Sequence, residues 1–351
     1  MKISSNKPTN SVVATERAGR AKWIRRVGSP KRGFRYLDAH DQRITLEEEL
    51  ARIKALVIPP AWTSVRICPN RRGKLQAIGI DKVGRLQYRY SDKFASAQQE
   101  IKFAKVAEFG RALPVLRRQI NADISLEGYP KAKVLAVMIR LINDLYIRVG
   151  SEQSVKLYKT YGVTTLRNRH LEIKPNGELH FNFIGKHHIR HRRIVVDEEL
   201  SAIMSDLKAM GGSKLFNYMS EGGTACSIKP SDVNNYIKTT TGGKFSAKDF
   251  RTWGASVLAA QELAEAGAAE SETKLKKNIV QMVKTVAERL GNTPAVCRSS
   301  YIHPTVIACY EKGMTIGEFV VRSKRQIRKV EPEYLPEEVG LLKLLENQNC
   351  K

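Results

Sequence analysis

The sequence between positions 291 and 301 reads Gly291-Asn292-Thr293-Pro294-Ala295-Val296-Cys297-Arg298-Ser299-Ser300-Tyr301. Before it, apolar residues recur at the i, i+3, i+4 and i+7 spacing of a helix: Leu275, Ile279, Met282, Val283, Val286 and Leu290. Gly291 stands where the left-handed residue after a helix belongs, and Thr293-Pro294 suits the N-cap and first turn of another helix. The pattern predicts two helices joined by a tight turn, with Tyr301 at the end of the second.

Tyr301 itself has two interpretations. A single tyrosine is most often a core aromatic residue whose hydroxyl finds a partner inside the protein. The alternative is a nucleophile, which needs cationic partners from other parts of the chain.

The composition indicates a folded protein with an anionic partner. The chain has 351 residues, of which 42% are hydrophobic, enough for two domains with their own cores. Its 60 Lys and Arg residues outnumber 35 Asp and Glu residues and give a formal charge of +25. Such a field attracts polyanions, most often nucleic acid, although a basic surface without a specific partner would have the same composition.

The cysteines and the hydropathy exclude several classes of protein. The five cysteines are scattered and form no C-x-x-C pair, so neither a disulfide framework nor a zinc site is expected. No apolar run reaches about 18 residues, and no secretory signal is visible. We therefore expect a reducing compartment and no contact with a membrane.

Residues 1–22 are polar and basic, and we expect a loose arm because they show no apolar periodicity. Residues 23–95 are expected to form a small domain built on an antiparallel sheet. Its predicted strands are Phe34–Tyr36, Ser64–Cys68, Leu75–Gly79 and Leu86–Tyr90, and its predicted helix is Leu46–Leu56.

Cations and aromatic rings alternate along part of this domain. They are Arg71, Arg72, Lys74, Arg85, Tyr88, Arg89 and Tyr90. Such a face can hold phosphates by charge and fit into a groove of DNA. An ordinary solvated sheet face with Tyr and Arg pairs across its strands would have the same sequence.

Residues 96–351 are expected to form a mainly helical domain with a β-hairpin, so the predicted fold class of the chain is α+β. Helical spacing covers residues 98–113, 115–120 and 132–149. The hairpin turns at Pro175-Asn176-Gly177. Its predicted strands are 164–173 and 179–184, and a third strand follows at 190–196.

Three cationic residues of this domain have both a structural and a chemical interpretation. Arg148 falls in the last turn of helix 132–149, where a cation commonly complements the helix dipole. Lys186 lies in the loop between two strands, where a plain surface lysine is usual. Arg251 lies in the first turns of a helix opened by the capping box Ser246-Ala247-Lys248-Asp249. The dipole does not favour a cation there, so Arg251 needs an anionic ligand or a neighbouring acid.

The remaining features of the domain are less specific. His187, His188 and His191 lack a helical i, i+4 pair and a carboxylate partner, so we expect no metal site. A basic run at 322–329 precedes an acidic, leucine-bearing end, which is expected to be a terminal helix packed on this domain.

Five residues of this domain together suit transesterification at a phosphodiester: Arg148, Lys186, Arg251, Asn292 and Tyr301. A tyrosyl oxygen can attack phosphorus in line, while guanidinium groups bind two phosphate oxygens at once. A lysine can give a proton to the departing sugar oxygen, which a guanidinium does poorly. This scheme requires neither a metal nor a cofactor.

Five separated motifs resemble those of a known family. They are Arg148-Val-Gly, Thr165-Leu-Arg-Asn-Arg-His-Leu-Glu-Ile, Phe183-Ile-Gly-Lys186, Lys248-Asp-Phe-Arg251-Thr-Trp, and Gly291-Asn-Thr-Pro with Tyr301. They resemble the type IB DNA topoisomerases of the short, poxvirus-like and bacterial kind. In the first domain, Val57-Ile-Pro-Pro-Ala-Trp and Gly84-Arg-Leu-Gln-Tyr-Arg-Tyr resemble the amino-terminal DNA clamp of the same family.

The resemblance implies a monomeric clamp around double-stranded DNA. Such an enzyme nicks one strand through a 3′-phosphotyrosine, here on Tyr301, lets the free end swivel, and reseals the strand without ATP or metal. Arg148 and Arg251 would stabilise the transition state, Lys186 with Arg148 would deliver a proton to the 5′ oxygen, and Asn292 would bind a nonbridging oxygen. The implied location is the cytoplasm, with the nucleoid if the source is bacterial.

The resemblance also implies that Arg85, Gln87, Tyr88 and Tyr90 meet the DNA. Two positions depart from the family pattern. Many members have His where this chain has Asn292, so we expect the hydrogen bond to be kept and any positive charge to be lost. Other members have a DNA-contacting Tyr where this chain has Ser154, which leaves the preferred cleavage sequence open.

Two other classes of protein would share part of this pattern. Tyrosine recombinases use the same Arg, Lys, Arg and Tyr chemistry, but they usually carry an all-helical domain where residues 24–94 here predict strands. A noncatalytic DNA-binding clamp could use Arg148, Lys186 and Arg251, but it would not need Tyr301.

Overall fold

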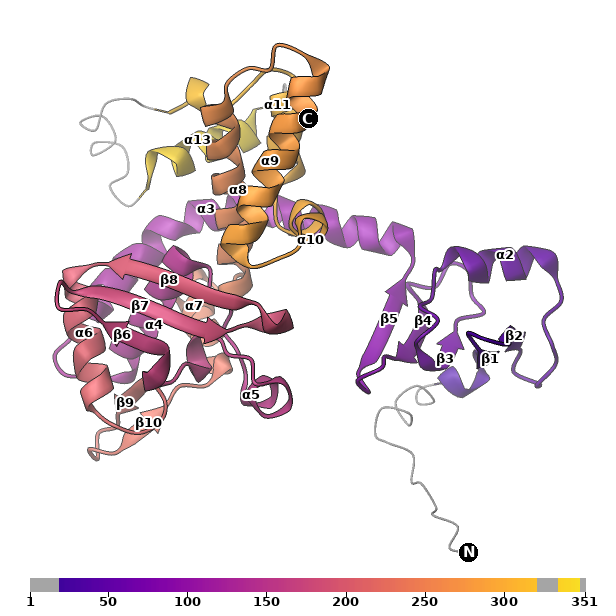
Figure 1. The fold of residues 1–351 in the computed structure, drawn as a ribbon, viewed down its shortest axis with the longest axis horizontal. Coiled ribbons are helices and arrows are strands. Elements are labelled where there is room, and N and C mark those ends of the chain that lie inside the picture. Colours follow the sequence, from indigo (N-terminus) through magenta and orange to yellow (C-terminus); the bar gives the residue numbers. More distant parts are fainter. Residues whose placement is uncertain (1–18, 321–333, 348–351) are drawn as a thin grey trace, which may run out of the picture. The chain divides into compact units, whose positions relative to one another are not determined.

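The computed structural model describes residues 19–320 and 334–347 (Figure 1). The chain divides into two compact units, residues 1–102 and 103–351. Most of the predicted N-terminal arm and the whole basic run 322–329 lie outside the described residues. The last residues of the arm form a short 3₁₀ turn, η1 (Arg20–Lys22).

The first unit is built on an antiparallel sheet with the strand order β2-β1-β3-β4-β5. The strands are β1 (Ile24–Ser29), β2 (Gly33–Leu37), β3 (Thr63–Ile67), β4 (Leu75–Ile80) and β5 (Leu86–Tyr90), and the helix is α2 (Glu47–Ala55). Ile24, Ile53, Val65, Ile67 and Ala77 form its core. The four predicted strands and the helix are confirmed. Strand β1 was missed, because Arg25 and Arg26 interrupt the apolar alternation that marks a half-buried strand.

Helix α3 (Asp92–Ile124) runs across the boundary between the units. The prediction of two helices, 98–113 and 115–120, was wrong, since the helix continues through Pro114. Proline costs a helix one hydrogen bond and a clash with the preceding turn. Here Leu113, Pro114 and Leu116 are all buried, so the packing of this face offsets the local cost.

Helix α4 (Lys131–Leu145) ends earlier than predicted, so Arg148 is not in a helix. Tyr146 takes up the left-handed conformation, with φ of 53°, and closes the helix. Its ring fills the space above Gly254, where a methyl group on that glycine would lie 2.0 Å from the ring. A tertiary contact therefore ends α4, and residues 146–150 have no regular secondary structure.

The second unit contains the predicted hairpin, extended to a three-stranded antiparallel sheet. Its strands are β6 (Leu171–Ile173), β7 (Glu178–Ile184) and β8 (Arg190–Val196). Only the end of the predicted strand 164–173 is a strand, because the 3₁₀ turns η2 (Val163–Thr165) and η3 (Asn168–His170) occupy its first part. The sheet lies beside α6, as Figure 1 shows.

Helices make up most of the rest of the unit. They are α5 (Glu152–Tyr158), α6 (Glu198–Ala209), α7 (Pro230–Thr241), α8 (Ala247–Ala266), α9 (Glu272–Leu290), α10 (Pro294–Ser300), α11 (Pro304–Glu311) and α13 (Pro336–Glu346). The short elements η4 (Lys186–His188), η5 (Ile316–Glu318), β9 (Asn217–Met219) and β10 (Ala225–Ser227) connect them. The α+β class is confirmed. Cys68, Cys226 and Cys297 carry free thiols, whereas Cys309 is disulfide-bonded, which the scattered spacing did not predict.

A buried carboxylate joins α13 to α3 and α8. The side chain of Glu338, which is 4% exposed, accepts two hydrogen bonds from Arg117 at 2.6 and 2.8 Å. It also accepts one from the indole Nε1 of Trp253 at 3.0 Å. The predicted terminal helix is therefore real and is held to the unit by an ion pair as well as by apolar contacts.

Replacing Glu338 with Ala should lower the free energy of unfolding by about 3–5 kcal/mol, because Arg117 would keep its charge in a mostly buried place without the carboxylate. Urea or thermal unfolding measures this loss. Glu346→Ala is the matched control on the same helix: its partner Arg111 lies at 2.6 Å, but both side chains are more than half exposed. That variant should lose less than about 1 kcal/mol. Equal losses would contradict a special role for the buried pair.

Candidate active site

Tyr301 stands directly after α10, as the sequence predicted. Gly291 closes α9 in the left-handed conformation, with φ of 62°, and the Thr293 hydroxyl accepts a hydrogen bond from Val296 N at 3.4 Å. The Tyr301 amide then donates to the Cys297 carbonyl at 2.9 Å. The hydroxyl of Ser256, buried in α8, contacts the Tyr301 carbonyl at 3.4 Å and accepts from the His303 amide at 3.0 Å. Local capping and α8 together fix the backbone of Tyr301.

Arg251 lies beside Tyr301 and is 3% exposed. Its guanidinium donates to two backbone carbonyls, those of Tyr146 and Leu290, the latter at 2.9 Å. These carbonyls belong to the ends of α4 and α9, where helices leave acceptors unpaired. The centre of the guanidinium lies 5.3 Å from the Tyr301 ring centroid. A buried arginine is thus held by neutral carbonyls, and its charge faces the tyrosine.

Arg148 reaches the same place from the segment without regular secondary structure that follows α4. Backbone hydrogen bonds hold that segment: Val163 N donates to the Arg148 carbonyl at 2.8 Å, and Thr164 N to the Val149 carbonyl at 2.9 Å. The Arg148 side chain donates from Nη2 to Oδ1 of Asn292 at 2.6 Å. A guanidinium only donates, so this contact fixes the amide with its oxygen toward Arg148.

The other end of the Asn292 amide remains available. Its Nδ2 is buried and has no hydrogen-bond acceptor among the residues that the structure describes. A buried donor without a partner costs about 1–3 kcal/mol, so this N–H group would gain from an acceptor supplied by a ligand. Asn292 therefore holds Arg148 through its carbonyl oxygen and keeps one buried N–H group without an acceptor.

The charges around Tyr301 change its acidity. Burial by itself would raise the pKa of the phenol, but Arg251 and Arg148 outweigh it, and the pKa is lowered. Burial and the nearby Arg148 lower the pKa of Arg251 to about 10. Burial also lowers the pKa of Arg148. The site therefore makes the phenolate of Tyr301 easier to form and leaves two cations beside it.

Lys186 is the predicted site residue that does not join this cluster. It begins the turn η4 between β7 and β8, its side chain is exposed, and it makes no hydrogen bond or ion pair within the described part of the chain. The predicted loop position is confirmed. The structure therefore brings Arg148, Arg251, Asn292 and Tyr301 together and leaves Lys186 on a turn that can approach a ligand.

Comparison with known proteins agrees with this geometry. Residues 91–327 match the family described as eukaryotic DNA topoisomerase I, catalytic core, and residues 33–81 match the bacterial DNA topoisomerase IB N-terminal domain. The chain is 31% identical to DNA topoisomerase 1B of Acanthamoeba polyphaga mimivirus over 298 residues, covering 83% of this chain and 87% of the relative. This chain belongs to the type IB DNA topoisomerases.

Poxvirus members of the family are more distant. DNA topoisomerase 1B of vaccinia virus and DNA topoisomerase I of monkeypox virus are each 27% identical over 242 residues, covering 67% of this chain and 72% of the relative. The topoisomerase is thus an enzyme, an isomerase of DNA topology. No helix among its described residues is long and apolar enough to cross a membrane.

Three of the predicted DNA-binding residues of the first unit lie on the two faces of β5, and Arg85 directly precedes this strand. Tyr88 and Tyr90 are 44% and 48% exposed. Their rings are stacked, with the ring centroids 6.3 Å apart. Gln87 lies on the opposite face by strand alternation and donates to Asp81 at 2.9 Å. Arg85 pairs with the same carboxylate at 2.8 Å. Of the four residues, the two tyrosines are therefore the most available to a ligand.

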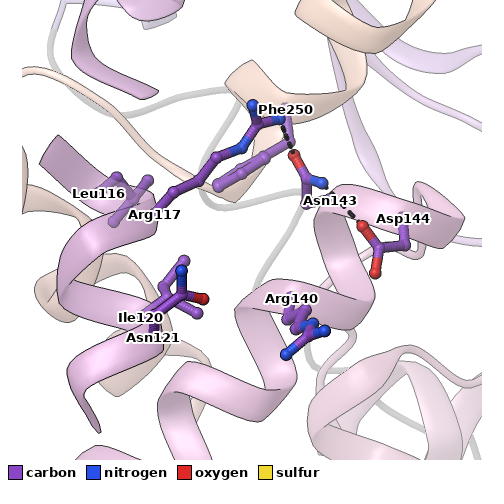
Figure 2. A pocket seen from close by; sticks show the side chains of 8 residues that line it. All are labelled: Leu116, Arg117, Ile120, Asn121, Arg140, Asn143, Asp144 and Phe250. Carbon is purple, nitrogen blue, oxygen red and sulfur yellow. Dashed lines mark hydrogen bonds between the residues drawn. The ribbon is translucent and has the colours of Figure 1, made fainter. Parts of the chain in front are cut away.

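A cavity of about 250 Å³ lies elsewhere in the topoisomerase, among α3, α4 and α8 (Figure 2). Two cationic side chains line this cavity, and both form ion pairs with carboxylates. Arg117 pairs with Glu338. Arg140 pairs with Asp197 and Glu199. Figure 2 shows Arg117 and Asn143 pointing toward one another, at 3.3 Å. None of the residues around Tyr301 lines this cavity, so we do not assign it to the site.

Sequence reasoning missed three residues that build the site. Tyr146 offers its carbonyl to Arg251, Ser256 holds the backbone after α10, and His191 packs between two turns of the site. Ser256 follows Arg251 by five positions on one helix, about 140° around the helix axis, so helical spacing did not connect the two residues. Nothing in the sequence spacing could have found Tyr146 or His191. Within the described ranges, no cluster of three His, Cys, Asp or Glu residues could hold a metal ion.

Proposed function

We propose that this topoisomerase relaxes supercoiled double-stranded DNA by cutting one strand through a 3′-phosphotyrosyl bond to Tyr301 and rejoining it. The observation that carries the proposal is the cluster around Tyr301. The guanidinium groups of Arg251 and Arg148 lower the pKa of its phenol, and Arg148 is held by Asn292, whose amide keeps a buried donor without an acceptor. These groups match a phosphodiester, which has two nonbridging oxygens and gains negative charge in the transition state.

In the proposed step, the Tyr301 oxygen attacks phosphorus with its electron pair and releases its proton to water. The bond between phosphorus and the 5′ oxygen breaks, and its electron pair leaves on that oxygen. The ammonium group of Lys186 gives the departing oxygen a proton. Rejoining is the reverse reaction, in which the 5′ hydroxyl attacks the phosphotyrosine.

The arginines and the amide have separate roles in this proposal. Arg251 and Arg148 bind the nonbridging oxygens and stabilise the charge that grows there. Asn292 donates its free N–H to one of these oxygens, while its carbonyl orients Arg148. An amide in place of a histidine supplies the hydrogen bond without a charge.

The reaction as proposed exchanges one phosphodiester for another, so the bond energy is conserved and no ATP is expected. The cations come from the side chains, so no metal is expected either. We further propose that residues 23–95 form a DNA-clamping domain joined to a catalytic domain at 96–351, and that the enzyme acts as a monomer. The proposed location is the cytoplasm, with the nucleoid if the source is bacterial.

We also propose that the first unit meets DNA through Arg85, Gln87, Tyr88 and Tyr90. The support for this is uneven, because Asp81 already engages Arg85 and Gln87. The exposed tyrosine rings can contact sugar and bases, and their hydroxyls can reach phosphates.

Tyr88→Ala should weaken duplex binding by about threefold to tenfold, as expected for a lost contact of about 1 kcal/mol. The salt dependence of binding should stay the same, because an uncharged phenol displaces no counterion from the DNA. Lys74→Ala is the matched variant, which removes a charge directly before β4. If Lys74 contacts a phosphate, the plot of log affinity against log salt concentration should become less steep by about 0.9 in this variant. Titrations of a labelled duplex at several salt concentrations measure both effects. Unchanged binding by the Tyr88 variant would remove this residue from the interface.

The direct test of the proposed function is relaxation of supercoiled plasmid by the purified protein in EDTA without nucleotide. We expect a ladder of topoisomers and then fully relaxed plasmid. Tight binding of the plasmid without relaxation would contradict the proposal and favour a noncatalytic clamp. Exchange of strands between two DNA sites would instead favour a recombinase.

A further inference from the structure

His191 lies between the two turns that carry Lys186 and Asn292. It stands on β8, is 6% exposed, and stacks on Phe183 of β7, with ring centroids 5.1 Å apart and planes at 18°. The edge of its ring formed by Nε2 and Cδ2 faces Gly185, the residue before Lys186. The adjoining edge formed by Cε1 and Nε2 faces Gly291, the residue before Asn292.

Both contacts are so close that only glycine fits. A methyl group added to Gly185 would lie 2.5 Å from Nε2 of His191, and one added to Gly291 would lie 2.6 Å from Cε1. Gly291 also needs its positive φ of 62° for the helix cap, but Gly185 has φ of −97°, which any residue adopts. The backbone conformation therefore does not explain the glycine at 185, whereas the His191 ring does.

The ring contributes shape and not charge. Burial lowers the pKa of His191 to about 4, and Arg193, Arg148 and Arg251 act in the same direction. The imidazole is therefore neutral at physiological pH. It adds nothing to the positive charge around Tyr301, so its effect on the site comes through packing.

The two turns that contact the ring are held differently. The turn at Gly291 is fixed by its own hydrogen bonds, since Asn292 N donates to the Ala287 carbonyl at 2.9 Å and Arg251 donates to the Leu290 carbonyl. The turn at Lys186 is closed by a hydrogen bond from Gly185 N to the Ile189 carbonyl at 2.8 Å. Lys186, His187 and His188 are exposed. The ring of His191 thus contacts both turns.

We propose that His191 is a positioning residue that sets the distance between Lys186 and the cluster around Tyr301, because Gly185 and Gly291 both pack against its ring, on two adjoining edges. This inference rests on the proposed function, in which Lys186 gives a proton to the departing 5′ oxygen. It predicts that loss of the ring impairs proton delivery while the attack by Tyr301 is kept.

The first test compares two substrates with His191→Ala. Single-turnover cleavage of an ordinary duplex should slow by about 10- to 100-fold, the effect expected of a catalytic group displaced by about 1 Å. A duplex with sulfur in place of the departing 5′ oxygen should be cleaved within about threefold of the wild-type rate, because a thiolate leaves without a proton. His191→Gln fills more of the space than alanine, so its cleavage rate on the ordinary duplex should lie between those of the wild type and His191→Ala. It replaces His191→Ala in the test if the alanine variant does not fold.

His170→Ala is the matched control. His170 is also a buried histidine, 7% exposed, with its pKa lowered to about 4, and its ring lies 6.4 Å from that of Phe183. It packs on Tyr161 and touches neither glycine. This variant should cleave both substrates at wild-type rates below its unfolding temperature. Slowing equal to that of His191→Ala would mean general loosening of the sheet and would overturn the inference.

The second test uses the glycine. Gly185→Ala should slow cleavage, because its methyl group collides with His191, and adding His191→Ala should restore part of the rate by making room. The double variant should therefore be faster than the product of the single effects predicts. Strict additivity of the two single effects would overturn the inference.

Lys186→Ala separates failure of the inference from failure of the proposed function. It should be slow on the ordinary duplex and fast on the sulfur duplex. If it is as fast as the wild type on both, the proposed role of Lys186 fails, and the inference fails with it. If Lys186→Ala behaves as expected while His191→Ala is at the wild-type rate, or is slow on both substrates, only the inference about His191 is overturned.

Discussion

Tyr301→Phe should abolish the covalent protein–DNA adduct and plasmid relaxation, with a loss of at least about 10⁴-fold in the cleavage rate. The variant loses the only atom that forms the bond to phosphorus in the proposed step, and loss of a nucleophile is among the largest effects that a single substitution causes. The ring, its backbone contacts to Cys297 and its place beside Arg251 stay the same. Binding of duplex DNA should therefore remain within about threefold of the wild type.

The adduct is measured with an end-labelled duplex on a denaturing gel. Tyr310→Phe is the matched control, since it also removes one phenolic hydroxyl, on the adjacent helix α11. That hydroxyl donates to the Gly267 carbonyl at 2.8 Å and accepts from Asn278 at 2.6 Å, so its role is structural. The control should lose about 1 kcal/mol of stability and keep its cleavage rate. An adduct formed by Tyr301→Phe at another residue would mean that the nucleophile is misassigned.

Arg251→Ala should slow cleavage by about 10²- to 10³-fold, the effect of removing one preorganised donor from a developing oxyanion. It should also shift the dependence of the rate on pH. A cation beside a phenol stabilises the phenolate, so removing the cation raises the pKa of Tyr301. The pH at which the rate is half-maximal should therefore rise in the variant. Single-turnover rates between about pH 6 and pH 10 measure both changes.

Arg193→Ala provides the comparison for Arg251→Ala. Arg193 also donates to a carbonyl at the end of α9, that of Arg289 at 2.6 Å, but it takes no part in the contacts of Tyr301. Arg251→Ala leaves the buried carbonyl of Leu290 without this donor, which costs about 1–3 kcal/mol of stability, whereas the bond that Arg193 makes is exposed. Rates must therefore be compared below the unfolding temperature of each variant. The control should lose less than about tenfold. A smaller effect of Arg251→Ala than of Arg193→Ala, or an unshifted pH profile, would refute the proposed role of Arg251.

The sequence by itself determined the parts of the site that depend on short-range signals. The apolar period of α9, the left-handed Gly291 and the Thr293-Pro294 start of α10 fixed the position of Tyr301, because each is a local property of the backbone. The capping box fixed the start of α8 and with it the position of Arg251. The turn at Pro175-Asn176-Gly177 fixed the hairpin and left Lys186 in a loop.

Only the tertiary structure decided how these pieces meet. The end of α4, and hence the segment that carries Arg148, depends on the ring of Tyr146 against Gly254, more than 100 positions away. The continuation of α3 through Pro114 depends on packing that a local rule cannot see. The orientation of Asn292 toward Arg148 and the contacts of His191 with Gly185 and Gly291 also depend on the tertiary fold. Contacts between residues far apart in the chain have no periodicity, so the sequence named most residues of the site, and the fold alone determined their distances.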